Sequence, residues 1–207
     1  MGLINGPISD AVKQGRIAAK WRIPAILGVF SLCAALAGDA GREWLRWDRD
    51  AIADGQIWRV VSGHFVHMSW SHFLLNFSGL VLVWLIVGER LASRPWVLIM
   101  TICIAGMGLG FWFLDPELQW YVGMSGLLHG LLMAGLIVGI RSAPQESILI
   151  GAFVVAKLIF EQLAGPLPGS ESASGGTVIV NAHLYGAITA SAVATVYLIR
   201  VRTVGAI

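Results

Sequence analysis

The polar side chains that could do chemistry stand at a few places in a chain that is otherwise strongly apolar. The most prominent group is the stretch Gly123-Met124-Ser125-Gly126-Leu127-Leu128-His129-Gly130, at the start of an apolar segment. Ser125 and His129 are four residues apart, so a helix would carry the hydroxyl and the imidazole on one face. An unpaired polar group is costly in apolar surroundings, and this stretch therefore needs a structural or a chemical reason.

Nucleophilic catalysis is one chemistry that these residue types allow. A serine hydroxyl is a weak nucleophile until a base within hydrogen-bond reach takes its proton. His183 is a candidate base from another apolar segment, whereas His129 lies about 6 Å further along the helix of Ser125. A tetrahedral intermediate also needs hydrogen-bond donors for its oxyanion, and His72 and Asn76, again four residues apart, can supply them beside the Ser125 amide.

The composition places this chemistry in a membrane. Hydrophobic residues make up 57% of the 207 residues and charged residues only 13%, with a mean hydropathy of +0.75. Soluble domains carry about 25% charged residues, so the chain is an integral membrane protein. We find no basic tract that would suggest nucleic acid, and no H-E-x-x-H pattern near the histidines, so we expect neither a metal nor another cofactor. Cys33 and Cys103 lie in apolar runs and suggest no disulfide.

The hydrophobic pattern predicts an all-α membrane protein with six transmembrane helices. The expected spans cover about residues 23–38, 70–91, 96–114, 124–140, 147–163 and 178–199. The first is short for a bilayer that needs about 20 residues, so we expect it to extend at one end. The loop 39–57 mixes charges with tryptophans, which is typical of a segment that lies on the membrane surface. The six-helix domain thus comprises residues 23–199, between a cytoplasmic segment 1–22 and a cytoplasmic tail 200–207.

Basic residues predict the orientation of these spans. One side would carry nine lysines and arginines, namely Lys13, Arg16, Lys20, Arg22, Arg90, Arg94, Arg141, Arg200 and Arg202. The other side would carry four, Arg42, Arg46, Arg49 and Arg59, offset by acids. Because cytoplasmic loops are enriched in such residues, both termini should be cytoplasmic. Spans two, four and six then begin outside, which puts their polar residues within roughly 10 Å of the outer helix ends.

Small residues predict which two of these helices pack closely. Residues four apart form one stripe on span four (Gly126, Gly130 and Ala134) and another on span six (Ala182, Gly186, Ala190 and Ala194). Stripes of this kind let helix backbones approach each other, and most serve packing alone. Here they would also bring the faces that carry Ser125 and His183 together.

Four motifs in this order resemble the rhomboid intramembrane serine proteases. They are Trp58-Arg59, His72-x-x-x-Asn76, Gly123-x-Ser125-Gly126 and Ala182-His183-x-x-Gly186, and the resemblance covers nearly the whole chain from the first span onward. It implies a six-helix rhomboid fold in which Ser125 is the nucleophile and His183 the general base, a dyad without an acid. By the same resemblance His72 and Asn76 are oxyanion donors, and Gly123 and Gly126 support the site.

His129 is a departure from many rhomboids, which carry a tyrosine four residues after the nucleophile. The longer pattern Gly-x-Ser-Gly-x-x-His-Gly resembles the rhombosortase branch. That resemblance implies a protease of the bacterial cytoplasmic membrane whose site opens to the outer, periplasmic side. Its implied partners, besides the lipid bilayer, are envelope proteins cleaved near a C-terminal Gly-Gly-containing tail with a transmembrane helix. We expect His129 itself to support His183 by packing or by a hydrogen bond, in preference to acting as a second base.

Other interpretations remain open. The chain could be a general rhomboid for single-span substrates, an inactive rhomboid-like protein that binds membrane helices, or a channel or transporter, although a channel predicts polar residues spread through the bilayer. A serine in a membrane helix commonly bonds a carbonyl of the preceding turn. Lys157 and Glu161 are spaced for an intrahelical ion pair with a structural role, the alternative being contact with a substrate tail or a water path. His64 and His67 are expected to order a loop.

Overall fold

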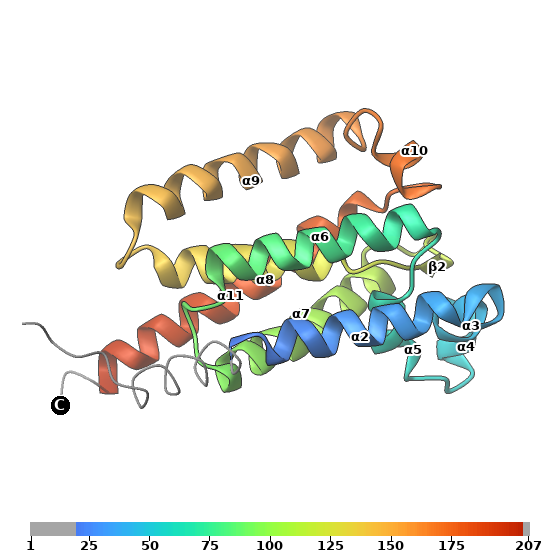
Figure 1. The fold of residues 1–207 in the computed structure, drawn as a ribbon, viewed down its shortest axis with the longest axis horizontal. Helices are drawn as coiled ribbons and strands as arrows, with labels where there is room; N and C mark the ends of the chain where they lie inside the picture. Colours follow the sequence, from blue (N-terminus) through green and yellow to red (C-terminus); the bar gives the residue numbers. More distant parts are fainter. Residues whose placement is uncertain (1–19, 205–207) are drawn as a thin grey trace, which may run out of the picture.

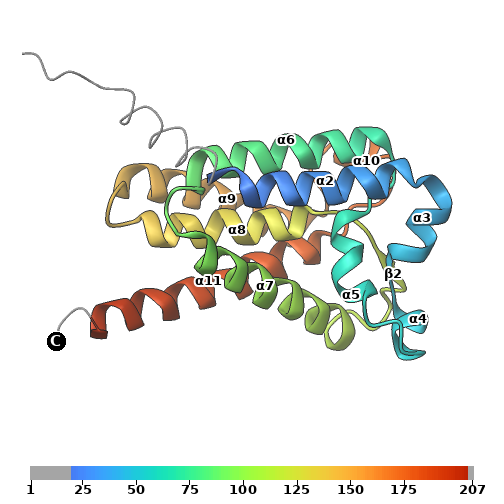
Figure 2. The ribbon, with the colours of Figure 1, turned by 60° about the horizontal axis from the view of Figure 1, so that its bottom comes forward.

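The computed structural model describes residues 20–204, with side chains up to residue 201. Most of the predicted segment 1–22, and the last three residues of the predicted tail 200–207, therefore lie outside the described residues. The helices are α2 (Arg22–Leu36), α3 (Gly38–Leu45), α4 (Arg49–Ala53), α5 (Arg59–Ser62), the 3-10 helix η1 (Gly63–Phe65), α6 (Trp70–Val87), α7 (Ser93–Phe113), α8 (Ser125–Gly139), α9 (Pro144–Ala164), α10 (Ser170–Ser174) and α11 (Val180–Val204). Two short strands, β1 (Trp47–Asp48) and β2 (Trp120–Tyr121), complete the described fold. The short elements gather at one end of the long helices (Figures 1 and 2).

Six apolar helices occupy the positions of the six predicted spans. Among the described residues, α6, α7, α9 and α11 are each long and apolar enough to cross a membrane. Helices α2 and α3 pass the same test only as a pair, and a bend of 118° separates them. The chain therefore turns after α2 and does not lengthen the first span as expected. Helix α8, with 15 residues, is apolar but shorter than a full span.

Lipid contact explains the outer surface of the helices. Large apolar side chains such as Leu149 and Phe153 on α9 are more than 70% exposed. Similar side chains cover outward faces of α2, α6, α7 and α11. A soluble monomer rarely exposes contiguous apolar patches of this kind, whereas hydrocarbon tails solvate them. The structure is thus that of a multi-pass membrane protein.

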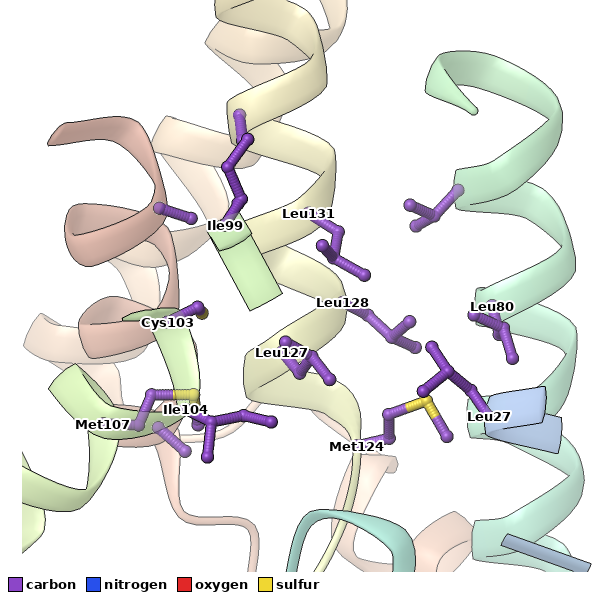
Figure 3. Packing of buried hydrophobic residues seen from close by; sticks show 14 of the residues in the cluster. Leu27, Leu80, Ile99, Cys103, Ile104, Met107, Met124, Leu127, Leu128 and Leu131 are labelled. Atoms are coloured by element: carbon purple, nitrogen blue, oxygen red, sulfur yellow. The ribbon is translucent and has the colours of Figure 1, made fainter. Parts of the chain in front are cut away.

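Helix α8 occupies the centre of the bundle, where it packs against α6, α7, α9 and α11. Its Leu127 and Leu131 are fully buried, and Figure 3 shows them beside side chains of α7, including Cys103 and Met107. Leu80 of α6 closes the other side of this cluster (Figure 3). Because its neighbours shield α8 from lipid, nine of its residues, five of them glycine or alanine, are buried.

Helices α8 and α11 make the most extensive contact in the bundle, and the predicted small-residue stripes mediate it. A Cβ atom added at Gly126 would lie 2.7 Å from the carbonyl oxygen of Ala182. One added at Gly130 would lie 2.7 Å from the carbonyl oxygen of Gly186. Larger residues at these positions would push the helices apart, so the predicted close packing of spans four and six is confirmed.

The first connection between long helices is more ordered than a surface loop. Strand β1 pairs with β2 in an antiparallel register that sets Trp47 opposite Tyr121. The Arg49 guanidinium donates to four carbonyl oxygens in and just after the last turn of α7, those of Phe111, Trp112, Asp115 and Leu118. Arg59 donates to the carbonyl oxygens of Glu43 and Arg46 at the end of α3. These arginines satisfy carbonyl groups that helix ends leave without partners, and they fix the connection next to the site.

Candidate active site

Ser125 is the first residue of α8, and the chain before it is held in an unusual conformation. Gly123 has a φ angle of +121°, a value that favours glycine. Its N–H donates to the Gly63 carbonyl at 3.0 Å, and its carbonyl accepts the Tyr121 hydroxyl at 2.5 Å. The first N–H groups of a helix have no intrahelical acceptor, so the Ser125 amide is free to donate to a ligand.

His183 lies in the first turn of α11 and faces Ser125 across the close α8–α11 contact. Its Nε2 atom is 2.9 Å from the Ser125 hydroxyl oxygen. The histidine is 5% exposed, so its ring is held in place by its neighbours. The structure thus brings together two residues, 58 positions apart in the chain, that were predicted to form a nucleophile and its base.

An acidic side chain contacts the other ring nitrogen of His183. Glu161 on α9 places one carboxylate oxygen 2.9 Å from Nδ1 of His183 and the other 2.7 Å from the Lys157 ammonium. The predicted intrahelical ion pair of Lys157 and Glu161 is confirmed, but its contact with the histidine was missed. The resemblance implied a dyad without an acid, and the structure differs because α9 delivers a buried glutamate at the depth of the dyad.

His129 lies against His183 from the side of α8. The two imidazole rings stack with centroids 4.3 Å apart and planes inclined by 20°. The Nδ1 atom of His129 is 2.7 Å from the Ser125 carbonyl oxygen, which can only accept, so Nδ1–H is the donor. His129 therefore packs on His183, as expected, while its hydrogen bond goes to the backbone of α8 and not to His183.

His72 and Asn76 approach the same place from the first two turns of α6. A Cβ atom on Gly123 would be 3.0 Å from His72 Nε2, so this edge of the ring faces the segment before Ser125. The Met68 N–H points to His72 Nδ1 at 3.4 Å, which leaves Nε2 to carry the proton and to donate. The Asn76 amide donates to the His72 carbonyl oxygen at 3.2 Å and retains a second N–H.

A cavity of about 460 Å³ joins these residues. Its polar lining consists mainly of His72, Asn76, Ser125, His129, Lys157, Glu161 and His183. The rest of its wall is largely apolar and comes from α6, α8 and α9, with side chains such as Leu75, Leu82 and Phe153. All the predicted site side chains thus meet in one cavity, which continues as an apolar groove.

Two further histidines lie beside the site in the segment between α5 and α6. Burial lowers the pKa of His64 to about 4, and burial together with the nearby His72 lowers the pKa of His67 to about 3. Burial also raises the pKa of the Tyr121 hydroxyl. The Tyr121 and His64 rings pack edge-on, with their centroids 5.4 Å apart. These groups are therefore neutral at pH 7, and within residues 20–204 no cluster of His, Cys, Asp and Glu is arranged to hold a metal ion.

Comparison with known proteins agrees with this geometry. A family model described as the Rhomboid domain matches residues 54–200, which is more than two thirds of the chain and includes Ser125 and His183. The chain belongs to the rhomboid family.

Curated rhomboids of several bacteria resemble this chain. The rhomboid protease GlpG of Klebsiella pneumoniae is 28% identical over 179 residues, covering 85% of this chain and 62% of the relative. That of Yersinia enterocolitica is 32% identical over 154 residues, covering 69% of this chain and 52% of the relative. That of Salmonella typhi is 27% identical over 181 residues, covering 85% of this chain and 62% of the relative. This rhomboid chain therefore spans somewhat more than half the length of the relatives it matches.

Proposed function

We propose that this rhomboid protein is an intramembrane serine endopeptidase. The observation that carries the proposal is the 2.9 Å contact between the Ser125 hydroxyl and His183 Nε2, in a cavity lined by the predicted oxyanion donors. A histidine at hydrogen-bond distance from a serine hydroxyl can take its proton and thereby activate the serine as a nucleophile. Its relatives named as rhomboid proteases support the proposal.

The geometry supports a two-step acyl transfer. The Ser125 oxygen attacks the peptide carbonyl carbon while His183 Nε2 takes the hydroxyl proton. Negative charge then develops on the carbonyl oxygen, where His72 Nε2–H, the second Asn76 N–H and the Ser125 amide can donate. The carbon–nitrogen bond breaks as His183 returns its proton to the leaving amine. Attack on the acyl-enzyme by water, or by another acceptor, releases the product and restores the serine.

The apolar part of the cavity suggests how a membrane-anchored substrate reaches the serine. The groove lies between α6 and α9, each of which packs on α8 more than on the other. A transmembrane segment that enters from the lipid between these helices would keep its apolar side chains in apolar surroundings. Its end would unwind beside Ser125, where buried donors can satisfy its backbone groups.

The substrate class that we propose within this mechanism is that of a rhombosortase. Support comes from His129, which stands where many rhomboids carry tyrosine and which stacks on the base. The substrates would be envelope proteins with a C-terminal Gly-Gly-containing tail and a transmembrane helix. Replacing the two glycines by leucines in a reporter substrate should lower cleavage at least tenfold. Equal cleavage of both reporters would favour the second candidate, a general rhomboid for single-span substrates.

We also propose six spans with both termini in the cytoplasm of a bacterium, and a site that opens to the outer side of the inner membrane. The distribution of basic residues supports this orientation. Helix α8 would be about 22 Å long, which is sufficient for a span that other helices shield from lipid. A reporter that is active only in the periplasm, fused after residue 207, should be silent, and activity of that reporter would contradict the proposed topology.

Substitution of the nucleophile tests the proposed activity. Ser125→Ala should abolish both cleavage of a transmembrane reporter and covalent labelling by a fluorophosphonate, because alanine has no nucleophilic oxygen. Ser31→Ala is the matched control, since Ser31 is a buried serine of α2 far from His183 in the chain, and it should be labelled as the wild type is. Undiminished labelling of Ser125→Ala would refute the assignment. A cellular phenotype that survives this substitution would instead favour an inactive helix-binding protein.

A further inference from the structure

A continuous row of polar contacts leads from Lys157 through Glu161 to His183, and the proposed mechanism assigns no role to the first two residues. Lys157 Nζ contacts one oxygen of Glu161 at 2.7 Å, the other oxygen contacts His183 Nδ1 at 2.9 Å, and His183 Nε2 contacts the Ser125 hydroxyl at 2.9 Å. We infer that Glu161, oriented by Lys157, is a positioning residue that holds His183 as the tautomer able to accept the serine proton. The inference rests on the proposed protease function and replaces a dyad by an acid-supported triad.

Hydrogen-bond chemistry determines where the imidazole proton sits. An ionised carboxylate can only accept, so a carboxylate oxygen 2.9 Å from Nδ1 requires a proton on Nδ1. In the neutral imidazole Nε2 then has a free lone pair, and this atom faces the Ser125 hydroxyl. The Lys157 ammonium, at 2.7 Å from the carboxylate, favours its ionised form. Lys157 is also 3.4 Å from Nδ1, but an ammonium has no acceptor for the Nδ1 proton.

The position of Glu161 fits a role in orienting His183 better than it fits a simple ion pair within α9. The Glu161 side chain is 2% exposed, whereas that of Lys157 is 20% exposed and borders the cavity. A surface pair at this spacing would keep both groups in water, but here the carboxylate is buried against a histidine of another helix. Burial of a carboxylate is costly unless all its oxygens are hydrogen-bonded, and Lys157 and His183 together meet that need.

The same arrangement stabilises the charge that forms during the reaction. When the Ser125 proton moves to Nε2, His183 becomes an imidazolium and its Nδ1–H remains hydrogen-bonded to the carboxylate. Glu161 takes no proton in this step, and its negative charge stabilises the positive charge of the imidazolium. The Lys157 ammonium contacts the second oxygen and so favours the orientation in which the first oxygen faces the ring.

Glu161→Gln tests the inference with almost no change in shape. Lys157 donates only, so it should hold the amide oxygen and turn the amide NH₂ toward His183 Nδ1. Nδ1 must then accept, and its proton moves to Nε2, where it blocks the base. We expect kcat for a transmembrane reporter to fall about 10³- to 10⁴-fold, as for a serine protease with the wrong tautomer, with KM changed less than threefold.

A second substitution separates positioning from structural support. Lys157→Met combined with Glu161→Gln frees the amide to rotate, so that its oxygen can accept from Nδ1 again. The double variant should therefore regain at least tenfold in kcat over Glu161→Gln alone. A merely structural ion pair predicts no recovery, because the double variant has lost both partners. Glu146→Gln is the matched control on the same helix, at the opposite end, and should keep kcat within twofold.

The tautomer can also be measured without catalysis. In ¹⁵N-histidine spectra of the full chain in micelles, the His183 proton should be on Nδ1 in the wild type and on Nε2 in Glu161→Gln, with His183→Asn for assignment. The inference is overturned if Glu161→Gln keeps a third of wild-type kcat, if the double variant does not recover, or if the tautomer does not change. An inactive wild type that Ser125-directed phosphonates do not label would instead overturn the protease function, and the spectra would still decide the positioning.

Discussion

The contact between α8 and α11 should make the proposed catalysis sensitive to a single methyl group at Gly130. A Cβ atom there would lie 2.7 Å from the Gly186 carbonyl oxygen and 2.6 Å from the Cys103 sulfur. Ordinary contacts of a Cβ atom begin at 3.4 Å, so in Gly130→Ala the two helices must separate by about 0.7 Å. Neither backbone can yield locally, because both belong to regular helices.

The separation acts on the site because its two central residues come from these two helices. Ser125 lies on α8 and His183 on α11, and their present distance of 2.9 Å would grow to about 3.6 Å. That distance is beyond the range of a hydrogen bond. We expect kcat to fall about 100-fold, the usual effect of a displacement of this order, and the free energy of unfolding to fall by about 1–3 kcal/mol.

Cleavage kinetics in micelles and a thermal unfolding scan measure the two effects separately. Gly151→Ala is the matched control, because a Cβ atom at Gly151 of α9 meets no atom within 4 Å. This control should keep wild-type kcat and gain up to about 1 kcal/mol of stability from its helix propensity. The reasoning is refuted if Gly130→Ala has the kcat and unfolding temperature of the wild type.

Two further predictions concern the connection that supports the site. Arg59→Met removes the donor that pairs with the carbonyl oxygens of Glu43 and Arg46 and with Gln56, so we expect the free energy of unfolding to fall by about 3 kcal/mol in thermal or denaturant scans. For His64, the pKa of about 4 in the fold lies below the ordinary 6.5, so the unfolded chain binds its proton first as the pH falls. The stability that neutral His64 provides is therefore complete above pH 6.5 and falls by about 2 kcal/mol by pH 5. In unfolding scans His64→Phe should lack this contribution to the loss, because phenylalanine does not titrate.

The sequence alone predicted those features that follow from periodicity and from local spacing. The apolar segments predicted six apolar helices, and the small-residue stripes at Gly126 and Gly186 predicted the pair that packs most closely, because only small side chains permit such an approach. The order of the motifs predicted Ser125 as nucleophile and His183 as base, and the predicted topology of the spans placed them at one depth. These inferences need only helix geometry and the cost of polar groups in an apolar environment.

The tertiary structure decided which side chains meet across helices that the sequence cannot orient. Glu161 was visible as one half of an ion pair with Lys157, but its second oxygen has a partner only because α9 turns that face toward α11. The pairing of β1 with β2 and the hydrogen bond from Arg49 to the end of α7 likewise join segments more than 60 residues apart in the chain. Spacing along one helix determines neighbours on that helix, whereas the rotation of one helix against another follows from the packing of the whole bundle.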